Sequence, residues 1–151
     1  MKKIIYKLTY LTALFALFYS CDDVERVFYN DGAETVLTLS DDNLVLNEEN
    51  ASNEILTLTW TQPDFGFSAA ALYSVQIDVQ GGDFSNPQII SVGGAFDKTF
   101  TVEELNAKLL SLSMVPNEEG VASFRIKATL SEYQEIYSNT ANISVTPYSS
   151  L

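Results

Sequence analysis

Alternation of apolar and polar residues over most of the chain predicts β-strands. The alternation is strictest at 73–79, 122–130 and 141–146, where every second residue is apolar. A strand of this kind buries one face and leaves the other to water. Runs of this type, most of them bounded by Gly, Asn, Asp or Pro, predict strands at Thr35–Leu39, Leu44–Leu46, Ile55–Trp60, Leu72–Val79, Gln88–Val92, Lys98–Thr101, Val121–Leu130 and Asn139–Val145.

One segment departs from the alternation and predicts a helix. Thr101 and Glu104 have the spacing of a capping box, in which the Thr101 hydroxyl accepts from a free amide and Glu104 reaches back to the Thr101 amide. An apolar stripe at helical spacing follows, formed by Leu105, Leu109 and Leu112. We expect a helix of about ten residues that covers one end or edge of the sheets and ends before Pro116.

Short strands with turn residues between them predict an all-β fold. We expect an immunoglobulin- or fibronectin III-like antiparallel β-sandwich of about seven strands, with one short helix before the penultimate strand. Segment 56–63 resembles the second strand of fibronectin type III domains, because Leu56, Leu58 and Trp60 share one parity and Pro63 follows. That parity places Trp60 in the core; the alternative is a surface platform for stacking a sugar.

The first 33 residues follow a different pattern. Three lysines precede an apolar run at 8–20, as in a secretory signal, and the run is shorter than the roughly 20 residues of a membrane span. Cys21 stands where this run ends, which resembles a bacterial lipoprotein signal whose cysteine is lipidated. We expect a signal peptide over 1–20, lipidation of Cys21, an acidic flexible tether over 21–33 and a sandwich domain over 34–149. The alternatives are an uncleaved anchor and a free thiol in a secreted protein.

Composition argues against catalysis and against a nucleic-acid partner. The sequence has no histidine, so mechanisms that need an imidazole base or a histidine-activated nucleophile are absent. One cysteine cannot form an internal disulfide or a cysteine-only zinc site. The 20 acidic residues outnumber the 8 basic ones, which is the wrong sign for neutralising phosphates. We therefore predict a protein that is not an enzyme, needs no cofactor or metal and binds no nucleic acid.

Two segments have the composition of a weak sugar contact. A pyranose has an apolar face and a rim of hydroxyls, so its binding needs exposed aromatic rings beside amides and carboxylates. Segments 62–67 and 132–137 fit this description, and their candidate glycan contacts are Phe65, Phe67, Tyr133 and Tyr137. The alternative for both segments is that the rings anchor a loop or pack a hairpin.

The order of these features resembles one family, the N-terminal domain of SusE-type outer-membrane lipoproteins from starch-utilisation-like systems. The resemblance rests on Cys21 with acidic residues after it, and on segments 54–63, 71–78, 99–106 and 142–148. It implies a lipid-anchored protein on the exterior face of the outer membrane, which helps to capture polysaccharide beside a porin-like importer and its glycan-binding lipoprotein partner. In this family the sugar-binding residues lie in later domains, so the resemblance implies that this domain is chiefly a spacer.

These inferences together predict a non-catalytic surface lipoprotein of a glycan uptake system, with this domain as spacer or scaffold. The alternative is a stand-alone immunoglobulin-like adhesion or assembly lipoprotein whose ligand is a protein.

Overall fold

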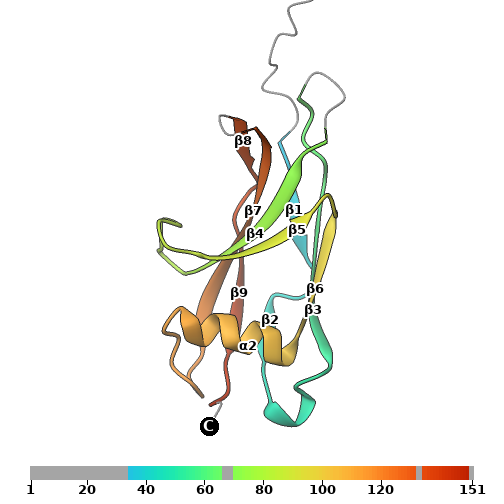
Figure 1. The fold of residues 1–151 in the computed structure, drawn as a ribbon. Helices are drawn as coiled ribbons and strands as arrows, with labels where there is room; N and C mark the ends of the chain where they lie inside the picture. The colour runs from blue at the N-terminus through green and yellow to red at the C-terminus, as the bar shows by residue number, and fades with distance from the viewer. Residues whose placement is uncertain (1–33, 66–69, 132–133, 150–151) are drawn as a thin grey trace, which may run out of the picture.

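The computed structural model describes residues 34–65, 70–131 and 134–149 and shows two β-sheets packed face to face (Figure 1). The three-stranded sheet has the order β1 (Leu37–Leu39), β3 (Glu54–Trp60), β6 (Asp97–Thr101). The six-stranded sheet has the order β2 (Asn43–Val45), β9 (Ala141–Thr146), β7 (Gly120–Ser131), β4 (Leu72–Val79), β5 (Gln88–Gly93), and β8 (Gln134–Tyr137) also pairs with β7. The predicted all-β sandwich is confirmed.

One pair of strands differs from the antiparallel arrangement that we predicted. The chain leaves the smaller sheet after β1 and joins the larger sheet as β2, which runs parallel to β9. Ser40 and Asp42 hold the crossing on both sides, because the Ser40 amide donates to the Thr57 carbonyl and the Ser144 amide donates to the Asp42 carbonyl. The chain changes sheets here without reversing its direction, so β2 lies parallel to the last strand.

Each predicted strand has an observed counterpart, with bounds that differ by one or two residues at most ends. Strand β8 was not predicted, because its four residues contain only two apolar positions, Ile136 and Tyr137, which do not alternate. Its presence changes the position of the helix in the strand order. Among the described elements, the helix precedes β7 and is followed by three strands, so it does not stand before the penultimate strand as we predicted.

Side chains from the inner faces of both sheets form one core. Trp60 is buried in it, as its parity predicted, and its ring lies 6.0 Å from that of Tyr73 between ring centroids, across the two sheets. The fully buried side chains of the strands are Leu56, Leu58, Val75, Ile77, Phe100, Ala122, Phe124, Ile126, Ala128, Ile143 and Val145. Alternation in the strictest runs therefore identified the inward face correctly.

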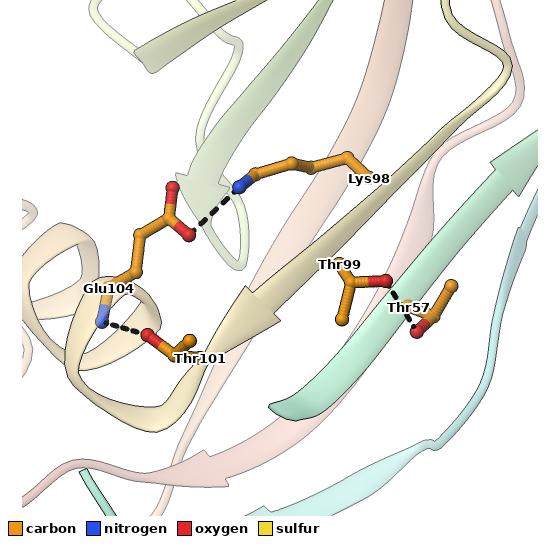
Figure 2. Close-up of polar contacts among 5 residues, drawn as sticks. All are labelled: Thr57, Lys98, Thr99, Thr101 and Glu104. Carbon is orange, nitrogen blue, oxygen red and sulfur yellow. Dashed lines mark hydrogen bonds and ion pairs between the residues drawn. The ribbon is translucent and has the colours of Figure 1, made fainter. Parts of the chain in front are cut away.

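Helix α2 (Val102–Ser111) begins where we predicted. The Thr101 hydroxyl accepts a hydrogen bond from the Glu104 amide at 3.2 Å (Figure 2). The Glu104 carboxylate does not follow the second half of the predicted capping box and instead accepts from Lys98 Nζ at 2.8 Å. This difference arises because Thr101 is also the last residue of β6, where it pairs with Glu54. The Thr57 hydroxyl of β3 lies 3.0 Å from the Thr99 hydroxyl of β6, and the two form a hydrogen bond (Figure 2).

Helix α2 lies across the end of the sandwich at which β9 ends, while β8 lies at the opposite end (Figure 1). Its inward residues Leu105 and Leu109 are fully buried. The expectation that the helix covers one end of the sheets is confirmed. In the part of the chain that the structure describes, no helix has the length and apolar character needed to cross a membrane.

Candidate functional site

The candidate glycan contacts have different positions in the structure. Phe65 is 1% exposed, so it packs in the core and presents no ring surface to a sugar. Phe65 therefore fits the alternative in which the ring anchors a loop, and it is not a glycan contact. Tyr137 is 38% exposed at the end of β8. Phe67, Tyr133 and the predicted lipidation site Cys21 lie outside the described residues.

Tyr137 belongs to a group of side chains on the outer face of the six-stranded sheet, centred on Arg125 of β7. The rings of Tyr137 and Phe84 each have their centroid 4.2 Å from the Arg125 guanidinium carbon. Arg125 Nε donates to Gln76 Oε1 at 2.7 Å, and Gln76 lies directly opposite on β4. We refer to Gln76, Phe84, Arg125, Lys127, Glu135 and Tyr137 as the Arg125 patch.

Each contact in the patch restricts the motion of the arginine side chain. A cation over an aromatic ring is stabilised by about 0.5 to 2 kcal/mol, depending on how far water is excluded. The hydrogen bond to Gln76 fixes the direction of the guanidinium plane as well. The patch therefore holds a cation in a defined orientation on a sheet face that sequence alternation alone describes as solvent-exposed.

The charges on the β8 side of the patch are set by hydrogen bonds. Tyr137 Oη donates to Glu135 Oε2 at 2.9 Å, and Glu135 also forms an ion pair with Lys127. The hydrogen bond from Lys127 lowers the pKa of Glu135, and the bond from Tyr137 lowers it further. Burial raises the pKa of Tyr137, and its hydrogen bond to Glu135 adds to the increase. At neutral pH the glutamate is therefore ionised and the tyrosine is a neutral donor.

Phe84 reaches the patch because the loop between β4 and β5 folds back over the sheet. Asp78 is buried on the outer face, where its Oδ2 accepts from the Phe84 amide at 2.9 Å and its Oδ1 accepts from the Val79 amide at 2.8 Å. Phe84 has a φ of 55°, a left-handed conformation that is unusual for a phenylalanine. The ring over Arg125 is thus held in place by a buried carboxylate and by a strained backbone.

Gly82 is required by this fold of the loop. A Cβ atom at this position would lie 2.3 Å from Asp78 Oδ2, which is closer than any ordinary contact. Gly82→Ala should therefore displace Asp78 or the loop, move the Phe84 ring from Arg125 and lower the free energy of unfolding by about 1 to 3 kcal/mol. The measurements are urea denaturation and the NMR shift of the Arg125 Nε proton, which senses the ring.

Gly94→Ala is the matched control, since the added methyl meets nothing within 4 Å and Gly94 does not have a left-handed φ. We expect this control to leave both readouts close to wild type. An Arg125 resonance that stays unshifted in Gly82→Ala would contradict the proposed coupling between the loop and the patch.

Two hollows lie away from the patch. A groove of about 530 Å³ follows the crossing from β1 to β2 and is lined by Leu37, Thr38, Leu39, Ser40, Asp41, Asp42, Ala141 and Asn142. A smaller hollow of about 290 Å³ lies beside the loop after α2 and includes Met114, Val115 and Glu118. Neither has an aromatic ring in its lining. Over residues 34–65, 70–131 and 134–149, no three acidic or thiol side chains come together in the manner of a metal site.

A match to a family model identifies the protein family of this chain. The family model described as SusE outer membrane protein matches residues 22–127. The chain belongs to the SusE family. The predicted resemblance is therefore confirmed, and so is the predicted location at the outer membrane.

The other two comparisons give a weak structural similarity to this SusE protein and no curated relative. A solved structure from the computer-based redesign of a β-sandwich protein is 14% identical, with a TM-score of 0.42, and the match covers 76% of this chain and 90% of that chain. No curated protein matches the sequence.

Sequence reasoning found one member of the patch in this SusE protein, Tyr137, and missed its centre. Gln76 and Arg125 occupy polar positions of two strictly alternating strands, a signal that assigns them to the outer face. Their contact depends on the pairing of β4 with β7 in a particular register, which one sequence does not determine. Phe84 gave no signal, because it lies in a run of turn residues.

Proposed function

We propose that this SusE-family protein is a non-catalytic, surface-exposed outer-membrane lipoprotein of a glycan uptake system. In this proposal Cys21 carries the lipid, and the sandwich is a spacer or scaffold that presents polysaccharide-binding parts to solution. The partners are a porin-like importer and its glycan-binding lipoprotein.

The observation that carries the spacer role is the placement of the two ends of the described chain. The described chain enters β1 from the end of the sandwich at which β8 lies, and it leaves β9 at the α2 end (Figure 1). Strand β7, with 12 residues, spans roughly 40 Å along this direction at the rise of an extended chain. A lipid on the N-terminal side would therefore be separated from anything joined after β9 by the length of the domain.

The contacts of three carboxylates support the absence of catalysis. Asp78 accepts from two backbone amides, Glu104 pairs with Lys98, and Glu135 pairs with Lys127. Hydrolysis of a glycoside needs two carboxyl groups placed on either side of a scissile bond. Carboxylates that are committed to structural partners in this way are poorly suited to that chemistry.

Substitution of Cys21 tests the anchor and the display together. The variant Cys21→Ala, carrying an epitope tag after Leu151, should move from the membrane fraction to the soluble fraction, since it has no thiol to acylate. Antibody against the tag should label intact cells that express the wild type and should not label cells that express the variant. Fractionation and labelling of intact cells are the two measurements.

Val24→Ala is the control, because it changes a residue near the signal and keeps the cysteine. It should be membrane-bound and surface-labelled like the wild type. Membrane retention of Cys21→Ala would exclude the lipid anchor. A wild-type protein whose tag is reached only after the outer membrane is permeabilised would exclude surface display.

A further inference from the structure

Arg125 has no carboxylate partner among the described residues, although the protein is strongly acidic. The chain has a net charge of −12, and the two lysines of the described strands, Lys98 and Lys127, each pair with a glutamate. Arg125 forms no ion pair with any carboxylate of the described residues, and its contacts there are the Gln76 oxygen and two rings. Two carboxylates of the same sheet are engaged elsewhere: Glu135 with Lys127, and Asp78 with backbone amides.

The loop that brings Phe84 to this arginine has a strained backbone. Phe84 adopts its positive φ and Gly82 approaches Asp78 closely, and together these features bring the Phe84 ring to the guanidinium. Strained residues that the surrounding structure holds in place often mark ligand sites. A surface arginine that only kept the protein soluble would need neither the strained loop nor two rings.

The chemistry left unused at Arg125 indicates the ligand. Nε is occupied by Gln76, whereas the two terminal nitrogens donate to no described residue. These nitrogens form a planar fork that matches a carboxylate with two parallel hydrogen bonds. The half-exposed Tyr137 ring beside it provides an apolar surface of the kind on which a pyranose packs.

We propose that the Arg125 patch binds a sugar that carries a carboxylate, namely a uronic acid residue of an acidic polysaccharide. The sugar carboxylate pairs with the Arg125 fork, and the pyranose ring lies along Tyr137. This inference rests on the proposed function in taking a glycan as the class of ligand. The rest of the molecule is acidic and repels an acidic polymer, so the attraction to Arg125 acts only at short range and the binding is weak. Repeated uronic acid residues in one polymer strengthen this binding.

A pair of ligands that differ only at the carboxyl group tests the proposal. The full-length protein, purified in detergent, is titrated calorimetrically with an oligogalacturonide and with the fully methyl-esterified form of the same oligosaccharide. We expect the acid to bind at least about tenfold more tightly than the ester, as for the loss of one charged hydrogen-bonded pair. The NMR signal of the Arg125 Nε proton should shift with the acid and stay in place with the ester.

Variants locate the binding at the patch. Arg125→Gln should weaken binding of the acid by about tenfold or more, and Arg125→Lys, which keeps the charge and loses the fork, should fall between that variant and the wild type. Lys98→Gln is the matched control, since it also removes one charge from a cation near a ring, Phe100 in the other sheet. It should bind like the wild type. Thermal unfolding checks that each variant is folded.

Several outcomes would overturn the proposal. These are equal affinity for acid and ester, unchanged affinity in Arg125→Gln, and no binding of either oligosaccharide. If Arg125→Gln does not fold, the comparison of acid with ester and the Arg125→Lys variant decide the question. Each of these results is independent of the fractionation of Cys21→Ala, so failure of the ligand assignment and failure of the proposed function can be told apart.

Discussion

Replacing Phe124 with alanine is expected to lower the free energy of unfolding by about 3 to 5 kcal/mol. Phe124 is 0% exposed on the inner face of β7, between Ile77 of β4 and Ala141 of β9. Removing the ring loses its burial and leaves a cavity that the neighbouring strands cannot close without breaking their pairing. A domain of this size is stable by about 5 to 15 kcal/mol, so this loss is a large share of the total.

Two further variants test whether the loss comes from burial of the side chain or from its apolar character alone. Leu72→Ala removes a large apolar side chain from the adjacent strand, where it is 64% exposed, and should change stability by less than about 1 kcal/mol. Phe124→Leu should fall between the two, because it leaves a smaller cavity. Chemical denaturation at one pH gives all three values. A loss in Phe124→Ala no larger than that in Leu72→Ala would mean that the two sheets do not share the core described above.

The success of the strand predictions has a local cause. In Tyr73 to Val79 and in Ala122 to Leu130 the pattern has a period of two, and burial of one face follows directly from it. The start of α2 is local too, because the Thr101 hydroxyl needs an amide only three residues away. Both features depend on residues that are close in the sequence, which is why the sequence predicts them.

Features that depend on pairing between distant segments were not predicted. The parallel pairing of β2 with β9 joins residues about 100 positions apart, and nothing in Asn43–Val45 specifies its partner. The contact of Arg125 with Gln76 joins residues 49 positions apart, and the choice of β4 as neighbour of β7 creates it. Glu104 is a local exception, because it bonds Lys98 only six residues earlier, where β6 leads directly into the helix.

Asn106 shows how one polar side chain can serve a structural role that its position in a helix does not reveal. It is 1% exposed, and its amide makes two hydrogen bonds with the backbone of Tyr148: Nδ2 donates to the carbonyl at 3.1 Å, and Oδ1 accepts from the amide at 2.8 Å. These are the bonds that a neighbouring strand would make. Asn106 thus ties α2 to the segment that follows β9.

Asn106→Leu should therefore lower the free energy of unfolding by about 2 to 4 kcal/mol, although leucine has the same branched shape and a higher helix propensity. The loss arises because both Tyr148 backbone groups lose their partners in a partly buried site. Hydrogen exchange of the Tyr148 amide should accelerate more than that of the β7 amides, since the bond is lost locally. Asn43→Leu, an exposed position in β2, is the control and should be nearly neutral. Unchanged protection of the Tyr148 amide in Asn106→Leu would show that another group holds this segment against the helix. The two hydrogen bonds would then contribute little to the stability of the end of the sandwich that α2 covers.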